Sequence, residues 1–204
     1  MKTTARFLLL LLLAVSQGSL DLCAESHQPD ANGYIHHWLM LAPIPLETDE
    51  TGAEAIEFNI LRREASLQPS VGQTEVVAGY QRQWQQVQSE GDIFDFNVEL
   101  KAPHDNAIGY LVAYLHAPET QQVNLLAGGN DQTRVFFNGE VVSTASGARA
   151  LTKDSDIASD LTLKQGLNVV VLKVINEVGN WQACLRLTNT DGQPLTNYQI
   201  SLTP

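Results

Sequence analysis

The stretch Arg134-Val-Phe-Phe-Asn-Gly-Glu-Val-Val142 decides the fold class of this chain. Two short, largely apolar runs flank the pair Asn138-Gly139. Asn-Gly readily takes the left-handed backbone angles of a tight type I′ turn, whose twist matches that of two antiparallel strands. The stretch therefore predicts a β-hairpin.

The sequence around this hairpin has the same strand character. From Gln73 onward, short apolar or alternating runs are separated by turn residues. The turn signals stand at Gly79, Gly91, Pro103, Pro118, Gly128-Gly129, Asn138-Gly139, Gly166, Gly179-Asn180 and Asp191-Gly192. Many short strands with regularly spaced turns predict an all-β fold, which we expect to be an antiparallel, jelly-roll-like β-sandwich.

Two of the strands are specified further. Residues 167–175 are nearly all apolar, which predicts a central strand covered on both faces. In the last well-formed strand, Trp181, Ala183, Leu185 and Leu187 alternate with Gln182, Cys184, Arg186 and Thr188. This period of two places Trp181 on the core face.

The N-terminal half is less regular. Residues 34–41 are rich in aromatic and large apolar residues, and they predict a first strand that stops at Pro43 and Pro45. Residues 48–64 alone have helical character, with Ile56 and Ile60 one turn apart. We expect one short helix near residues 50–64.

The first 24 residues have the pattern of a secretory signal peptide. A basic start with Lys2 and Arg6 precedes an apolar run over residues 7–15, which is too short to span a membrane. Cleavage after Ala24 is the leading interpretation, and a lipoprotein signal at Cys23 is the alternative. The expected product is secreted or extracytoplasmic, with a flexible lead over residues 25–33 and one β-sandwich domain over residues 34–204.

The charge limits the classes of binding partner, and the cysteine content limits the possible disulfides. The formal net charge is −11, which makes nucleic acid a poor partner, and no membrane insertion is expected after signal cleavage. Once Cys23 leaves with the signal, Cys184 has no partner for an intramolecular disulfide. A buried or half-buried Cys184 is expected, with stability supplied by core packing.

Four segments resemble a β-sandwich module of large secreted bacterial proteins. Residues 38–45 resemble its opening strand, W-x-x-x-G-P, and residues 125–142 resemble its hairpin, D-D-G-x-x-V-W-x-N-G. Residues 163–176 resemble its strand G-x-N-x-L-L-x-K-V, and residues 179–195 resemble its closing strand. The resemblance covers residues 34–196. The module is similar to galactose-binding-like jelly rolls and, more distantly, to protective-antigen-like domains of sugar-binding adhesins.

The resemblance implies carbohydrate binding, because the module often accompanies carbohydrate-active domains. In the adhesin relatives a paired acidic turn helps to hold a calcium ion. Here that turn is Asn130-Asp131-Gln132, with one carboxylate fewer. Asp131 is therefore only a weak candidate ligand for Ca²⁺, which needs several oxygen ligands. No other cofactor is expected.

Candidate ligand-binding residues lie on two strands and on the hairpin. Trp84 and Tyr80 stand among polar neighbours, while Tyr110 and Tyr114 share one face of a strand whose other face is apolar. Such rings could stack on sugars or pack in the core. Asn130, Asp131 and Asn138 could bind a sugar or a cation, or could merely shape turns. Trp38 and Trp181 are expected to pack in the core.

No metal or catalytic motif stands out. His36 and His37 are adjacent, so on a strand their side chains point to opposite faces and cannot chelate one ion there. No motif of a hydrolase, metalloprotease or nucleotide-binding enzyme occurs. The leading hypothesis is a secreted, non-catalytic binding module for carbohydrate or cell-surface recognition. The alternative is a structural or assembly protein that binds a cell-envelope protein through one sandwich face.

Overall fold

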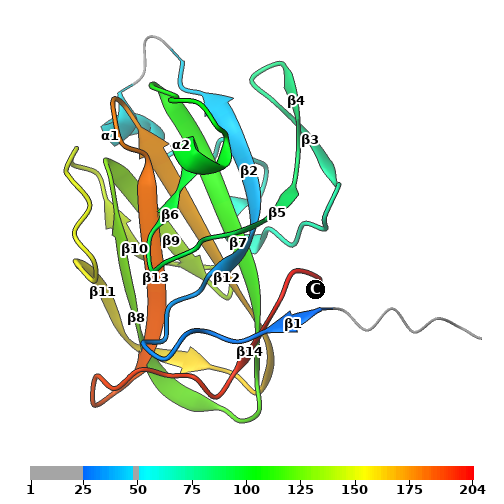
Figure 1. Cartoon of the computed structure of the whole chain (residues 1–204), viewed down its shortest axis with the longest axis vertical. Coiled ribbons are helices and arrows are strands. Elements are labelled where there is room, and N and C mark those ends of the chain that lie inside the picture. Colours follow the sequence, from blue (N-terminus) through cyan, green and yellow to red (C-terminus); the bar gives the residue numbers. More distant parts are fainter. Residues whose placement is uncertain (1–24, 48–50) are drawn as a thin grey trace, which may run out of the picture.

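The chain forms two packed antiparallel β-sheets with a small separate hairpin beside them (Figure 1). This arrangement is seen in a computed structural model, which describes residues 25–47 and 51–204. The prediction of an all-β sandwich is confirmed. The expected signal peptide, with Cys23, lies outside the described residues. Among the residues described, no helix is long and apolar enough to cross a membrane.

The larger sheet has eight strands and the smaller sheet four. The larger one contains β1 (Ser26–His27), β2 (His37–Pro45), β5 (Gln85–Gln88), β7 (Ala107–Ala117), β9 (Gln132–Phe137), β10 (Glu140–Ala145), β12 (Gly166–Asn176) and β14 (Gln199–Ser201). The smaller one contains β6 (Phe94–Asp95), β8 (Gln121–Gly129), β11 (Asp156–Leu163) and β13 (Gln182–Asn189). The separate hairpin pairs β3 (Thr74–Val77) with β4 (Tyr80–Gln83).

The predicted hairpin and central strand are both confirmed. β9 and β10 pair antiparallel around Asn138 and Gly139, whose φ angles are 50° and 91°. These positive angles are those of the type I′ turn that the Asn-Gly pair predicts. β12 lies between β7 and β9, and most of its residues are buried because the sheet is covered on both faces.

The main core lies between the two sheets. Trp38 and Trp181 are 1% and 0% exposed there, so their prediction as core residues is confirmed. The Trp181 ring stacks on Phe96 with 4.4 Å between centroids. Cys184 is buried, as expected, and forms no disulfide within the described part of the chain.

A second core covers the other face of the larger sheet. Side chains from residues 46 and 51–84, together with Leu202, pack there against side chains of β2, β7, β9 and β12. This segment contains α1 (Gly52–Ala55), the 3₁₀ turn η1 (Glu64–Ser66) and the β3–β4 hairpin. The larger sheet is therefore buried on both faces over much of its area.

A buried ion pair joins this covering segment to the sheet. Lys173 on β12 and Glu64 are both fully buried, with Lys173 Nζ 3.5 Å from Glu64 Oε1. Lys173 Nζ also donates hydrogen bonds to the carbonyls of Ala55 and Phe58, at 2.8 and 2.7 Å. Tyr110 donates its hydroxyl to Glu64 Oε1 at 2.5 Å. Burial and the neighbouring Glu64 raise the pKa of Tyr110 well above its usual value.

The helix content differs from the prediction. Instead of one helix near residues 50–64, the described part of that segment contains the single turn α1, which begins with a capping box between Thr51 and Glu54, and then turns leading to η1. Arg63 has a left-handed φ of 61°, which ends any helical continuation there. A further short helix, α2 (Phe96–Glu99), begins at Asp95 and was not predicted.

The first strand also differs from the prediction. β2 runs on to Pro45, because its register to β7 shifts between Leu41 and Ile44 and Pro43 lies in that irregularity. The lead over residues 25–33 supplies β1, which pairs with β14. Asp30 orders the following turn by accepting hydrogen bonds from the backbone N–H groups of Asn32 and Tyr34.

Candidate functional site

Trp84 is not on the surface. Its side chain is 0% exposed and belongs to the second core, so of the two alternatives left open, stacking on a sugar or packing in the core, the structure shows packing. Its backbone N–H donates to the carbonyl of Gln73, and its carbonyl accepts from Gly72. Trp84 therefore anchors the β3–β4 hairpin to the sheet, and its ring is not available for stacking on a ligand in this structure.

The face of β7 that carries Tyr110 and Tyr114 is also covered. Both side chains are 0% exposed in the second core, so here too packing, and not an open face, is the alternative that the structure shows. Their hydroxyls donate to Glu64 Oε1 and to the carbonyl of Pro69. The reason is the segment of residues 51–84, which folds over this face and supplies both acceptors, Glu64 and Pro69.

Tyr80 is the predicted aromatic residue that remains accessible. It is 50% exposed and lies on the β3–β4 hairpin, next to the turn formed by Ala78 and Gly79. The guanidinium of Arg82 lies 5.2 Å from the ring centroid, and Arg82 Nε donates to the carbonyl of Pro43 at 2.6 Å. The ring is thus half-exposed on a hairpin that is fixed to the body at its base.

The polar candidates on the β9–β10 hairpin do not form one site. Asn130 and Asp131 precede β9, whereas Asn138 follows it, so six residues of strand, roughly 20 Å, separate them. Asn138 accepts a hydrogen bond from the Val169 N–H and donates one to Asn168. Its side chain therefore holds the turn against β12.

Asn130 and Asp131 also make bonds within the fold. Asn130 donates from Nδ2 to the carbonyl of Arg149 at 3.1 Å. Asp131 is 8% exposed, and its Oδ2 accepts from the N–H groups of Glu177 and Val178 at 2.8 and 3.5 Å. This carboxylate is committed to the turn after β12, which argues against the weak calcium site predicted there.

Replacing Asp131 with alanine is expected to lower the free energy of unfolding by about 1–3 kcal/mol, the usual cost of leaving a buried donor unpaired. Asp131→Asn retains one acceptor oxygen and should cost less. Millimolar Ca²⁺ should not shift the melting temperature through this residue, which thermal melts in EDTA and in CaCl₂ will measure. A calcium-dependent stabilisation that disappears in Asp131→Asn would instead make Asp131 an ion ligand.

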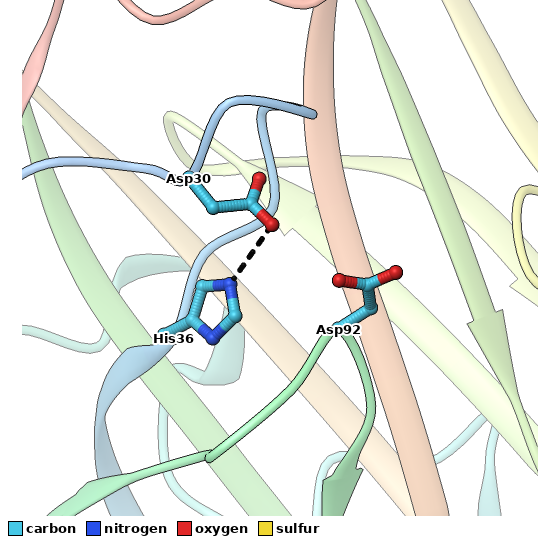
Figure 2. Close-up of side chains that lie close together, drawn as sticks. All are labelled: Asp30, His36 and Asp92. Carbon is cyan, nitrogen blue, oxygen red and sulfur yellow. Dashed lines mark ion pairs between the residues drawn. The ribbon is translucent and has the colours of Figure 1, made fainter.

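The structure does bring together one group of metal-ligand side chains that the sequence patterns did not indicate. Asp30, His36 and Asp92 each offer one ligand atom, and these atoms all lie within 4.8 Å of one another. Figure 2 shows the two carboxylates and the imidazole ring turned toward a common space. Asp30 comes from the N-terminal lead, His36 precedes β2, and Asp92 lies in the turn between β5 and β6.

The orientation of His36 is set from behind by Ser89. His36 Nδ1 lies 3.4 Å from the carbonyl oxygen of Ser89 and 3.3 Å from its hydroxyl. The other ring nitrogen, Nε2, lies 3.3 Å from Asp30 Oδ2. The buried His36 Nε2 has no hydrogen-bond partner among the described residues, so its contact with Asp30 has the distance of an ion pair without the direction of a hydrogen bond.

Lys153 lies beside this group and is its positive neighbour. Its Nζ is 2.8 Å from Asp92 Oδ2, in a contact where both side chains are partly exposed. The hydrogen bond from Lys153 lowers the pKa of Asp92 below its usual value, with a smaller contribution from the charge of Lys153 and a further one from His36. Asp92 is therefore a carboxylate at neutral pH.

Sequence reasoning missed this group because its members come from three separate segments. The expectation that His36 and His37 do not chelate one ion concerned a strand, on which neighbours diverge. The structure places the rings in different surroundings: His36 faces Asp30, and His37 stacks on His27 with 3.5 Å between centroids. A spacing of 6 residues between Asp30 and His36 is not a recognised ligand pattern.

Comparison with models of known protein families gives no match, and comparison with curated protein sequences gives none either. Among solved structures, one that this chain resembles is the crystal structure of the PA14 domain of the MpAFP antifreeze protein. The sequences are 12% identical, the match covers 86% of this chain and 88% of that domain, and the TM-score is 0.40. The similarity is to the general course of the chain, and it assigns no role to any residue here.

Proposed function

We propose that this chain is an exported, non-catalytic binding module that recognises carbohydrate at a cell surface or outside the cell. The observation that carries the proposal is the half-exposed ring of Tyr80 on a hairpin outside both sheets. Export follows from the signal-like N-terminus, and the carbohydrate class follows from the resemblance of residues 34–196 to secreted sandwich modules. The proposal includes no extended aromatic face, because Trp84, Tyr110 and Tyr114 are buried.

The β3–β4 hairpin suits such a role because Val77, Arg82 and the adjoining Trp84 hold it to the body, while Tyr80 beside the turn stays half-exposed. Trp84 and Val77 are buried in the second core, and Arg82 is bonded to the carbonyl of Pro43. Near the turn, Tyr80 and Val76 are 50% and 76% exposed. A rigid aromatic ring supplies contact area with little loss of conformational entropy, which favours stacking on a sugar ring.

A binding screen of the exported protein against soluble and insoluble polysaccharides tests the proposal. For a polysaccharide that binds, Tyr80→Ala is expected to weaken binding by more than about 1 kcal/mol, as for the residues that dominate an interface. Affinity electrophoresis or pull-down measures this change, and the melting temperature should stay near that of the wild type because the ring is half-exposed.

Phe58→Ala is the matched control. Phe58 is 58% exposed on a different segment, so its loss should change neither binding nor stability. Equal losses of binding in the two variants would remove the hairpin from the site. A folded wild-type protein that binds no polysaccharide would end the carbohydrate proposal.

The second candidate is an assembly protein that binds a protein of the cell envelope through the same hairpin. It is favoured by Val76, which is 76% exposed and lies directly across from Gln81 on the side away from Val77. Val76→Asp should then abolish co-purification with the envelope partner and leave any polysaccharide binding intact. Loss of polysaccharide binding alone would favour the first candidate.

A further inference from the structure

We infer that Asp30, His36 and Asp92 form a binding site for one divalent transition-metal ion of the Zn²⁺ type. Asp30 Oδ2, His36 Nε2 and one oxygen of Asp92 would be the protein ligands, and water would complete the coordination. This site is separate from the hairpin proposed to bind carbohydrate, so the two proposals stand or fall independently.

The distances fit zinc coordination. Bonds of 2.0–2.1 Å at tetrahedral angles place two ligand atoms roughly 3.3 Å apart. His36 Nε2 and Asp30 Oδ2 are already 3.3 Å apart. All three ligand atoms lie within 4.8 Å, so a modest rotation of the side chains closes the set around one ion.

The direction of His36 Nε2 favours a metal over a shared proton. A proton between nitrogen and carboxylate oxygen requires a nearly straight N–H···O arrangement. Nε2 is buried and makes no such bond within the described part of the chain, although Asp30 is at ion-pair distance. A metal ion lies off the line between its two ligand atoms, and it would satisfy both lone pairs in this bent arrangement.

The groups behind the ligands are those that orient metal ligands in proteins. A ligating histidine commonly donates its second ring N–H to a backbone carbonyl, and His36 Nδ1 faces the carbonyl oxygen of Ser89. Asp30 is fixed in the same way, since its Oδ1 accepts from the N–H groups of Asn32 and Tyr34 and leaves Oδ2 for the ion.

The ligand types select the metal. One imidazole nitrogen with two carboxylate oxygens suits zinc and similar ions, whereas Ca²⁺ and Mg²⁺ prefer oxygen ligands alone. Lys153 competes with any cation for the charge of Asp92. Its side chain is 46% exposed, so it can move into solvent when the ion binds.

The test uses the exported protein without an affinity tag, stripped with EDTA and dialysed. Titration with ZnCl₂ by calorimetry, and metal content after equilibrium dialysis, should show one saturable Zn²⁺ per chain, with no comparable binding of Ca²⁺ or Mg²⁺. The Zn²⁺-bound protein should also melt at a higher temperature, because an ion that binds only the folded state stabilises it.

Three ligand variants and one competitor variant locate the site. His36→Gln, Asp30→Asn and Asp92→Asn should each weaken Zn²⁺ binding by at least the roughly 10–100-fold that loss of an outer-shell partner causes. Lys153→Gln should instead strengthen it, because it removes the competing ammonium from Asp92. A gain in affinity cannot arise from poor folding, so this variant keeps the test decisive if a ligand variant folds badly.

His37→Gln is the matched control. Its ring stacks on His27, and it is the sequence neighbour of His36. Unchanged binding in His37→Gln, with loss in His36→Gln, supports the assignment. The inference is overturned if the wild type binds no Zn²⁺ saturably, if His37→Gln abolishes binding, or if Lys153→Gln fails to strengthen it.

Discussion

Replacing Trp181 with alanine is expected to lower the free energy of unfolding by about 3–5 kcal/mol, the range for removing a large buried aromatic side chain. Trp181 is 0% exposed between the two sheets, and its ring stacks on Phe96. Urea unfolding followed by circular dichroism measures the loss. A lower midpoint with an unchanged slope of free energy against urea concentration shows that stability itself has fallen.

The packing around Trp181 leaves little room to compensate for its loss. A Cβ atom on Gly109 would lie 2.8 Å from Trp181 Cζ2 and 2.5 Å from Phe96 Cε1, so the two rings fill the space above this glycine. The backbone of a sheet strand cannot easily collapse into the vacated volume, and a residual cavity adds to the cost.

Trp181→Phe is the control for size. Trp181 Nε1 has no hydrogen-bond partner in the described part of the chain, so the smaller ring loses packing but no polar bond. We expect a clearly smaller loss than for alanine. An alanine variant that unfolds like the wild type but loses a ligand would contradict the core assignment and place Trp181 in a binding site.

The features that the sequence predicted well depend on near neighbours. The Asn138-Gly139 turn, the buried strand β12 and the inward face of Trp181 all follow from local backbone preference or from a period of two. Each of these patterns spans about ten residues or fewer, so a single segment is enough to predict the turn, the buried strand or the inward face.

The sequence did not predict which side chains of the larger sheet are buried under a second layer. Alternation places Tyr110 and Tyr114 on the face of β7 opposite Leu111, but it does not say that a second layer buries that face. The described part of the covering segment, residues 51–84, has little regular period, since it consists mainly of turns, one-turn helices and a short hairpin. Trp84 was misassigned for the same reason, because its polar neighbours point away from the core.

The Asp30–His36–Asp92 group could not be predicted for a related reason. Its members lie on three segments that the fold brings together, and Asp92 is more than 50 residues from His36. Ligands that come from separate loops produce no spacing motif. The pair His36-His37 does include one member of the group. The expectation for this pair assumed that both residues lie on a strand, whereas His36 precedes β2.

Breaking the buried pair between Lys173 and Glu64 is expected to be about as costly as losing Trp181. Lys173→Met leaves the Glu64 carboxylate buried without this positive neighbour, and Glu64→Leu removes that carboxylate from the Lys173 ammonium, which keeps its hydrogen bonds to the carbonyls of Ala55 and Phe58. Lys173→Met should lower the free energy of unfolding by about 3–5 kcal/mol, the usual cost of an uncompensated buried charge, and Glu64→Leu should also lower it.

The double variant Glu64→Leu/Lys173→Met separates the charge effect from packing. It removes both charges, so it should cost less than the sum of the single changes, and the difference in a double-mutant cycle is the coupling energy. In Glu64→Leu, the loss of stability should include local unfolding around residues 51–84, because Glu64 also accepts hydrogen bonds from the N–H groups of Ile60 and Leu61. Hydrogen exchange of these amides would show it.

The same pair connects stability to the accessibility of the aromatic face. If residues 46–84 detach in Lys173→Met, Tyr110 loses its acceptor Glu64, and both Tyr110 and Tyr114 become exposed to solvent. Tyrosine fluorescence quenching by acrylamide should then rise in Lys173→Met and return toward the wild-type value in the double variant. Single variants that unfold like the wild type, with unchanged exchange at residues 60 and 61, would show that the pair does not hold the covering segment on the sheet.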